Sequence, residues 1–137
     1  MSIDAGALQA EAVGLFAGQH VLAELEGIDP ELLDDEQFLR DTLDSALHRS
    51  RATVCQVIAQ RFEPQGVTVL ALLSESHASL HTYPEDGSIF IDVFTCGNRA
   101  QPEQAVHLLA EALSPSSVTT QTIRRGRDHG TEFVSQR

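Results

Sequence analysis

Runs of apolar residues, some continuous and some alternating with polar residues, divide the chain into candidate strands. Five segments have this character, namely residues 20–27, 52–62, 67–74, 88–96 and 117–125. Residues 67–74 are almost continuously apolar, as is typical of a central strand, whereas residues 88–96 alternate with the two-residue period of a strand. The pattern therefore predicts a sheet that contains both a central, buried strand and a strand whose two faces differ.

The alternating segment predicts what lies on each face of this sheet. Its side chains form two sets, Ile89, Ile91, Val93 and Thr95 on one face and Phe90, Asp92, Phe94 and Cys96 on the other. Both sets contain large apolar residues. We therefore expect helices to cover one face, and a second layer, most simply a copy of the same chain, to cover the other.

Two helices are predicted from helical spacing of apolar residues. The first follows an acidic segment in which Asp34 or Asp35 can cap the helix N-terminus, and it ends near Arg49. The second begins at Pro102, a position where the missing N–H of proline costs nothing, and its apolar face includes Leu113.

The order of these elements predicts an α+β fold. One strand precedes the first helix and several strands follow it, and among these the stretch "HASLHTYPE" at residues 77–85 is strand-like or loop-like. We expect a two-layer α/β sandwich, an antiparallel sheet with helices on one face, dimerising to a four-layer αββα arrangement. Residues 18–126 would form the domain, residues 1–17 an N-terminal extension with a helical stretch over 5–16, and residues 127–137 a polar C-terminal tail.

The composition fits a single domain outside the membrane. The chain has 137 residues, of which 42% are apolar, enough for one core but not for two domains. No apolar run approaches the roughly 20 residues that cross a bilayer. The N-terminus lacks the basic start and cleavage site of a signal peptide. A cytoplasmic protein with no membrane partner is expected.

The net charge bears on the possible partners, and the cysteine content bears on whether a disulfide forms. The net charge of −11 argues against a phosphate-binding surface, and so against nucleic acid, but it is compatible with a cationic small molecule. Cys55 and Cys96 are far apart and form no CxxC pair, so two free thiols are expected. Cys55 lies in an apolar strand and is predicted to be a small core residue.

The segment from Ser74 to His81 concentrates hydroxyl, imidazole and carboxylate groups in eight positions. A serine-hydrolase interpretation lacks a GxSxG turn around the nucleophile. His77 and His81 are four residues apart, but their surroundings are not helical and no third ligand is evident, so no metal is expected.

Self-processing is a third interpretation of the same segment. The hydroxyl of Ser76 can attack the carbonyl that precedes it, turning the Glu75–Ser76 amide into an ester. A base such as His81 can then remove the α-proton of the serine, and elimination breaks the chain. Hydrolysis of the new N-terminus leaves a pyruvoyl group, a ketone made from the protein's own backbone.

The stretch "SESHASLHTYPEDGSIFIDVFTCG" resembles the processing and active-site signature of the pyruvoyl-dependent S-adenosylmethionine decarboxylases of bacterial and archaeal type. The core ESHxSxHTxPE followed by DxFTCG is specific, because a chance match over some twenty ordered positions is very improbable. The resemblance extends more weakly from "GQHVLAEL" to "IRRG", so it covers most of the domain but not residues 1–17.

The resemblance implies a proenzyme that cuts itself between Glu75 and Ser76. Residues 1–75 would become the β chain and residues 76–137 the α chain, with Ser76 converted to the covalent pyruvoyl cofactor. His81 matches the histidine that assists processing in the family. Thr68 stands where family members often have a serine whose hydroxyl helps processing.

The same resemblance implies how the mature enzyme works. The substrate amine condenses with the pyruvoyl ketone as a Schiff base, CO₂ leaves, and Cys96 matches the cysteine that donates the returning proton. Phe62 matches the aromatic residue that stacks on adenine, and Glu85 the glutamate that holds the ribose hydroxyls. The product would be decarboxylated S-adenosylmethionine, used in spermidine biosynthesis. An (αβ)₂ dimer or higher assembly is implied, with the active site near its interface.

Departures from the family pattern keep two alternatives open. Tyr83 replaces a frequent tryptophan, and Glu63 and Gln65 replace positions that are often apolar. Because Glu63 could attract a cationic head group, L-ornithine or L-arginine is an alternative substrate for the same fold. A non-processing regulatory homologue is a second alternative, although Ser76, His81 and Cys96 are all retained.

Overall fold

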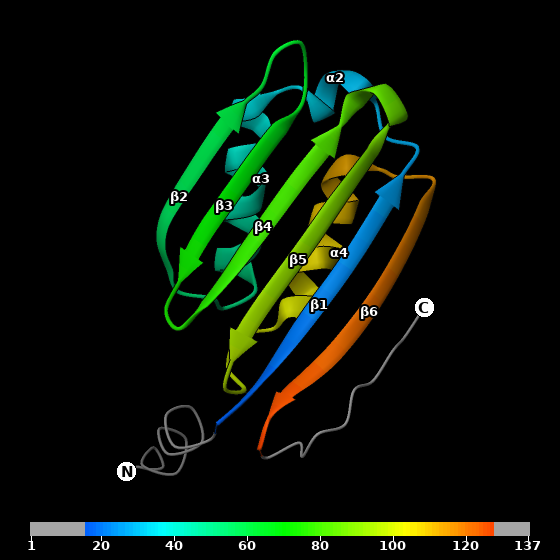
Figure 1. The fold of residues 1–137 in the computed structure, drawn as a ribbon. Coiled ribbons are helices and arrows are strands. Elements are labelled where there is room, and N and C mark those ends of the chain that lie inside the picture. The colour runs from blue at the N-terminus through cyan, green and yellow to red at the C-terminus, as the bar shows by residue number, and fades with distance from the viewer. Residues whose placement is uncertain (1–15, 128–137) are drawn as a thin grey trace.

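The structure, a computed structural model, describes residues 16–127. One six-stranded sheet forms its centre (Figure 1). Its strands are β1 (Ala17–Glu26), β2 (Val54–Arg61), β3 (Val67–Leu73), β4 (Ser76–Tyr83), β5 (Ser88–Cys96) and β6 (Ser117–Gly126). The predicted features of residues 1–15 and 128–137, including the helix over 5–16, lie outside the described residues.

Every neighbouring pair of strands in the sheet is antiparallel. The spatial order is β2-β3-β4-β5-β1-β6, so β5 pairs with one side of β1 and β6 pairs with the other side. The β3–β4 connection is a tight hairpin, which brings Leu73 opposite Ser76. Within the stretch 77–85, whose strand or loop character the sequence left open, residues up to Tyr83 therefore belong to a central strand, and Pro84 and Glu85 to the turn that follows.

The helical elements of residues 16–126 are α2 (Pro30–Leu33), α3 (Glu36–Arg49), α4 (Pro102–Leu113) and the 3₁₀ turn η2 (Pro84–Asp86). The Asp35 carboxylate caps α3 by accepting from the Phe38 N–H, which confirms one of the two predicted caps. Pro102 is the first residue of α4, as its rigid backbone predicts. The short helix α2 was not predicted.

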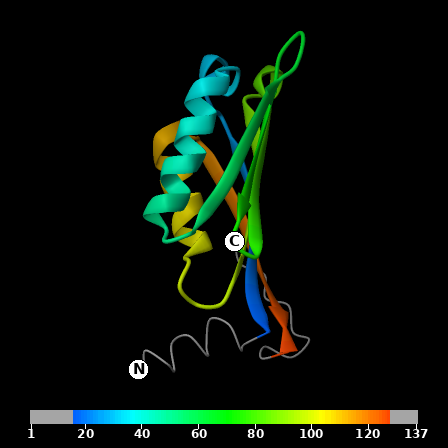
Figure 2. The same ribbon diagram turned by 90° about the vertical axis from the view of Figure 1, so that its left-hand side faces the viewer.

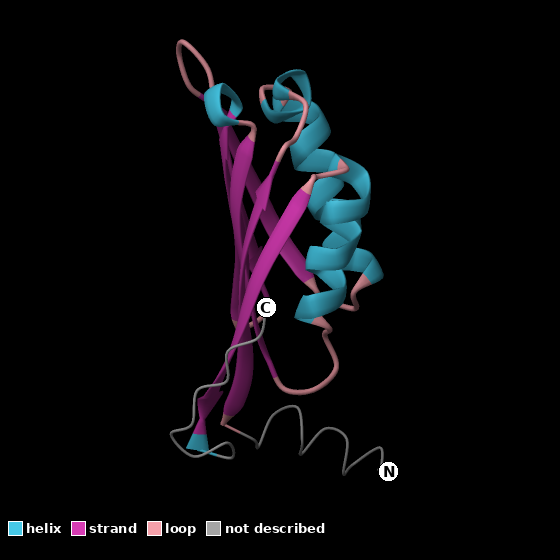
Figure 3. Cartoon of the chain, turned by 90° about the vertical axis from the view of Figure 1, so that its right-hand side faces the viewer, coloured by secondary structure: helices cyan, strands magenta, loops and turns pink. Residues whose placement is uncertain are grey.

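The helices lie on one face of the sheet and leave the other face open, as the two edge-on views show (Figures 2 and 3). The core lies between α3, α4 and the sheet, and alternate strand residues point into it. Ile89, Ile91, Val93 and Thr95 are all buried, which confirms the predicted face assignment of β5. This antiparallel α/β sandwich confirms the predicted fold class.

Thr82 on β4 connects the short helix α2 to the sheet. Its buried hydroxyl donates to the Leu33 carbonyl at 2.6 Å and accepts from the Val67 N–H at 2.9 Å. A buried hydroxyl without partners would be costly, and here both of its hydrogen-bonding functions are used. The contact fixes α2 against β3 and β4.

The open face is apolar but also carries the polar residues of interest. Leucines at 70 and 72 are 46% and 56% exposed, and Ile58 and Phe90 are exposed on the same face. The strand register arranges the central residues of this face in three cross-strand rows: Leu72, His77, Phe94 and His20; Leu70, Ser79, Asp92 and Leu22; Thr68, His81, Phe90 and Glu24.

Cys55 corrects one prediction. It is exposed rather than part of the core, because β2 is an edge strand and its register shifts between Val54 and Gln56. A residue at such a bulge does not follow the alternation of its strand. None of the helices within residues 16–127 is long and apolar enough to cross a membrane.

Candidate active site

The predicted cleavage position lies in the β3–β4 hairpin turn. Glu75 has a φ of 61°, in the left-handed region that a residue with a side chain rarely adopts. The Ser76 hydroxyl donates to the Ser74 carbonyl at 3.1 Å, so it lies within the same turn. The backbone therefore stores strain at the residue whose carbonyl the sequence predicts to be attacked.

Cys96 reaches this same carbonyl from the end of β5. Its thiol donates to the Glu75 carbonyl oxygen at 3.1 Å, although 21 residues separate the two in the sequence. Burial, and then the Glu75 carboxylate, raises the pKa of the Cys96 thiol above its ordinary value. The thiol therefore holds its proton at neutral pH, and it polarises the carbonyl that Ser76 would attack.

Thr68 and His81 form a second group. The Thr68 hydroxyl and Nδ1 of His81 are 2.9 Å apart, across the β3–β4 pair where the two residues are directly opposite. A hydrogen bond on Nδ1 fixes the orientation of the imidazole and leaves Nε2 for another partner. The structure thus brings together the two residues expected to assist processing.

The loop after β2 presents Phe62, whose side chain is 49% exposed. The Phe62 N–H donates to the Gly66 carbonyl at 2.8 Å, which closes the loop on itself. Glu85 is exposed within η2, at the β4–β5 connection. β2 and β4 both end at the upper side of the sheet in Figure 1, so the two residues expected to bind substrate lie at the same end of the sheet.

Asp34 holds the Phe62 loop in place. Its carboxylate accepts from the Arg61 guanidinium at 2.8 Å and from the Gly66 N–H at 2.9 Å. Arg61 also donates to Glu63, at 2.8 Å. The hydrogen bond from Arg61, followed by the one from Gly66, lowers the pKa of the Asp34 carboxyl. Asp34 is a functional candidate that sequence reasoning missed, since nothing in the sequence pairs it with Arg61.

The site residues therefore fall into two groups at opposite ends of the sheet. Ser76 and Cys96 lie at the lower side in Figure 1, where β3 and β5 end, whereas Phe62 and Glu85 lie at the upper side. His81 is five residues beyond Ser76 along an extended strand, a separation of about 16 Å. One chain does not bring His81 to its own Ser76.

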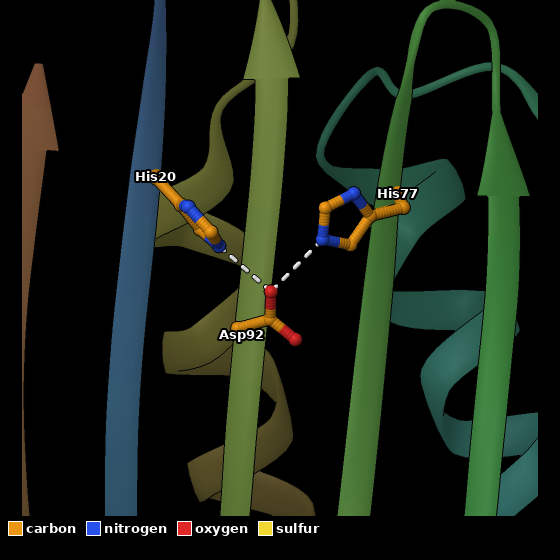
Figure 4. Close-up of side chains that lie close together, drawn as sticks. All are labelled: His20, His77 and Asp92. Atoms are coloured by element: carbon orange, nitrogen blue, oxygen red, sulfur yellow. Dashed lines mark hydrogen bonds and ion pairs between the residues drawn. The ribbon is translucent and has the colours of Figure 1, made fainter. Parts of the chain in front are cut away.

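A third cluster, the Asp92 cluster, lies on the open face beside Ser76 and consists of Asp92, His20, His77 and Ser79. Figure 4 shows His20 reaching from β1 and His77 from β4 toward Asp92 on β5 between them. Nε2 of His20 and Nε2 of His77 lie 2.7 and 3.0 Å from Asp92 Oδ2, and the Ser79 hydroxyl donates to Oδ1. Sequence reasoning missed this cluster, because strand pairing alone joins its members.

Electrostatics keeps the Asp92 carboxylate ionised. Its half-buried position would by itself raise the pKa of Asp92, but hydrogen bonds from Ser79, His20 and His77 outweigh this effect and leave the pKa below its ordinary value. Because an ionised carboxylate only accepts hydrogen bonds, both Nε2 atoms carry protons. The cluster is therefore a set of donors around one anion.

The Asp92 cluster has three groups that could ligate a metal, but its hydrogen bonding does not suit one. The ligand atoms of His20, His77 and Asp92 lie within 4.8 Å of one another. Arg125, however, lies 3.3 Å from Nδ1 of His20 and only donates, so Nδ1 must accept and Nε2 must hold the proton. A ligating histidine needs the opposite arrangement. His77 and His81, whose four-residue spacing was considered for a metal in the sequence, make separate contacts, His77 with Asp92 and His81 with Thr68.

Comparison with known proteins identifies the family of the chain. Residues 19–126 match the family model described as S-adenosylmethionine decarboxylase. The chain belongs to the S-adenosylmethionine decarboxylase family. It is 49% identical, over 80% of its length and 86% of the relative, to an S-adenosylmethionine decarboxylase proenzyme of Parasynechococcus marenigrum. It is also 43% identical to S-adenosylmethionine decarboxylase proenzyme 2 of Bacillus anthracis, over 80% of this chain and 89% of that relative.

A solved structure supports the family and the fold together. The crystal structure of the adenosylmethionine decarboxylase of Aquifex aeolicus superposes with a TM-score of 0.76 at 32% identity, covering 82% of this chain and 92% of that one. The resemblance drawn from the ESHxSxHTxPE and DxFTCG motifs is thereby confirmed. The roles of individual residues in this S-adenosylmethionine decarboxylase family member stay predictions.

The first prediction concerns Asp34. Because its pKa is lowered in the folded protein, its ionised form stabilises the fold above the ordinary pKa of about 3.9, and this contribution is lost as the pH falls through the lowered value. Asp34→Asn should therefore unfold at lower urea concentration than the unsubstituted protein at pH 6, with the gap closing toward pH 2. Glu63→Gln, which removes only the exposed partner of Arg61, serves as the control. A gap that widens on acidification would contradict the assignment.

Proposed function

We propose that this chain is a self-processing, pyruvoyl-dependent decarboxylase of S-adenosylmethionine. The single observation that carries the proposal is the turn at residues 74–76, where a strained Glu75, the Ser76 hydroxyl and the Cys96 thiol meet at one peptide bond. Attack by Ser76 on the Glu75 carbonyl needs a strained bond and a donor on the carbonyl oxygen. The family to which the chain belongs supports the same reaction.

The residues present fit the formation and use of a pyruvoyl group at position 76. Such a group supplies a carbonyl that withdraws the electron pair released when CO₂ leaves a bound amino acid. Cys96, whose raised pKa keeps its thiol protonated, lies next to this position and holds a proton that can be delivered there. No residue needs to move along the sheet for this step.

A second copy of the chain supplies what one copy lacks. His81 and Thr68 lie about 16 Å along the strand from Ser76, and Phe62 and Glu85 are at the far end of the sheet. If two open faces pack with their strands reversed, the far end of one chain meets the Ser76 end of the other. The exposed side chains of Leu70, Leu72 and Phe90 would then be buried in the interface, which is favourable for an apolar surface. We propose this (αβ)₂ dimer, with two shared sites and four layers.

The local charges favour S-adenosylmethionine over ornithine or arginine. Glu63, the residue that kept the amino-acid substrates open, accepts a hydrogen bond from the Arg61 guanidinium, and its side chain is 85% exposed. A carboxylate already paired with a guanidinium attracts a further cation weakly. Phe62, in contrast, is free to stack on a purine, and Glu85 is free to accept from sugar hydroxyls.

Self-cleavage is the direct test of the proposal. Purified protein should run as two fragments on a denaturing gel, and intact mass should show residues 1–75 and residues 76–137 with a pyruvoyl end. Ser76→Ala should remain one chain, because it lacks the attacking hydroxyl. Ser74→Ala, which leaves that hydroxyl in place, is the matched control and should still be cut. A single uncut wild-type chain bearing serine at position 76 would refute the proposal.

Sharing of sites between two copies makes a separate prediction. Ser76→Ala and His81→Ala chains should each remain uncut alone, for lack of the hydroxyl in one and of the imidazole in the other. Co-expressed with different tags, they should form mixed dimers in which the Ser76→Ala chain supplies His81 to its partner. Only the His81→Ala chain should then be cleaved. If both chains stay intact in purified mixed dimers, the two groups do not meet across the interface.

Substrate choice is tested by release of labelled CO₂ from S-adenosylmethionine, L-ornithine and L-arginine under the same conditions. We expect turnover of S-adenosylmethionine alone, with KM unchanged in Glu63→Gln and raised in Phe62→Ala by roughly tenfold, the effect of losing one stacking contact. Greater turnover of ornithine or arginine, or a loss of their turnover in Glu63→Gln, would instead support the alternative substrates.

A further inference from the structure

Cleavage at Glu75–Ser76 turns the middle of a hairpin into a chain end. Before the cut, β4 is held at its start by the covalent turn from β3. Afterwards residue 76 is an N-terminus, and chain ends fray unless something holds them. The proposed chemistry needs this end to stay beside the Cys96 thiol, so some contact close to residue 76 must replace the lost peptide bond.

His77 is the residue next to the cut, and its side chain is bound on the open face. Its Nε2 donates to Asp92 at 3.0 Å, and its ring lies 5.8 Å from that of Phe94, which is directly opposite on β5. The other ring nitrogen of His77 faces toward the β3–β4 turn in Figure 4. Asp92 and Cys96 lie on the same strand, four residues apart. The His77–Asp92 bond therefore ties the strand that carries residue 76 to the strand that carries the thiol.

Asp92 is itself held by the neighbouring strands. Besides His77, it accepts from His20 on β1 and Ser79 on β4. Arg125 on β6 approaches Nδ1 of His20 at 3.3 Å and lies 4.7 Å above the centre of the Phe94 ring. These contacts hold the carboxylate independently of His77, which makes Asp92 a fixed acceptor for the His77 ring.

We propose that Asp92 is a positioning residue that, through His77, holds the N-terminus created by cleavage in place beside Cys96. This inference rests on the proposed function, because it concerns the chain end that self-cleavage creates. It assigns Asp92 a role different from that of Cys96 or His81, since Asp92 does not touch the reacting atoms. Its partner His77 acts as a hydrogen-bond donor and not as a base.

Two substitutions of His77 separate the hydrogen bond from packing. His77→Gln keeps a donor that can reach Asp92 but removes the ring, whereas His77→Phe keeps a ring against Phe94 but removes the donor. Asp92→Asn keeps the shape of the acceptor and removes its charge. His107→Gln, at an exposed position on α4, is the neutral control.

Hydrogen exchange of the cleaved proteins measures how firmly the new end is held. Loss of a hydrogen bond to a charged group changes a local opening equilibrium by roughly tenfold. We expect amides of residues 77–80 to exchange about tenfold faster in Asp92→Asn and His77→Phe, and at nearly the wild-type rate in His77→Gln and His107→Gln. Amides of β2 should be unchanged in all four. Faster labelling of the carbonyl at residue 76 by phenylhydrazine should follow the same order.

The outcomes distinguish this inference from the proposed function. A wild-type chain that stays uncut removes both. If the wild-type protein is cleaved but residues 77–80 of Asp92→Asn and His77→Phe exchange at the wild-type rate, the inference alone is overturned. Equal loss of protection in His77→Gln and His77→Phe also overturns it, because the ring and not the hydrogen bond would then hold the end. Faster exchange of residues 77–80 in Asp92→Asn and His77→Phe, but not in His77→Gln or His107→Gln, supports the inference.

Discussion

The geometry of the extended β3–β4 hairpin is the constraint on which the site depends. A strand advances about 3.3 Å per residue, so the five residues from Ser76 to His81 place these two groups far apart on any straight strand. No side chain spans such a distance, and the helices occupy the opposite face of the sheet. A reversed second copy removes the conflict, because the two ends of the hairpin then come together across two chains. In the proposed dimer the same packing would also cover the exposed leucines, so one interface would serve both folding and catalysis.

Two of the acidic residues, Asp34 and Asp92, have specific structural contacts that the composition does not reveal. A net charge of −11 says little by itself, but Asp34 and Asp92 are each surrounded by donors that keep the carboxylate ionised and immobile. Asp34 fixes the loop that presents Phe62, and Asp92 fixes the strand that follows the cleavage point. In both cases a partly exposed anion orders backbone near the candidate site, which is where precise placement matters most.

The sequence predicted those features that depend on local pattern. The alternation of residues 88–96, the cap at Asp35 and the helix start at Pro102 each follow from the residues themselves. Features that depend on strand pairing were not accessible, so the Asp92 cluster and the Asp34–Arg61 contact appear only in three dimensions. Cys55 was wrongly placed in the core, because neither an edge position nor a bulge can be read from an apolar run. The motif identified Ser76 and Cys96 as candidates, but only the structure brings both groups to the Glu75–Ser76 bond.

The position of Cys96 makes one thiol suitable for two successive reactions. In the uncut chain it donates to the carbonyl of Glu75, which is the oxygen that gains negative charge when Ser76 attacks. The proposed cleavage would place that carbonyl at the end of the other chain and leave the thiol beside residue 76, with its proton retained by a raised pKa. A thiol with a lowered pKa would be ionised and could neither donate to the oxyanion nor return a proton to carbon. Partial burial of Cys96 next to Glu75 would therefore serve both proposed steps, and the tight turn that strains Glu75 also brings the two residues together.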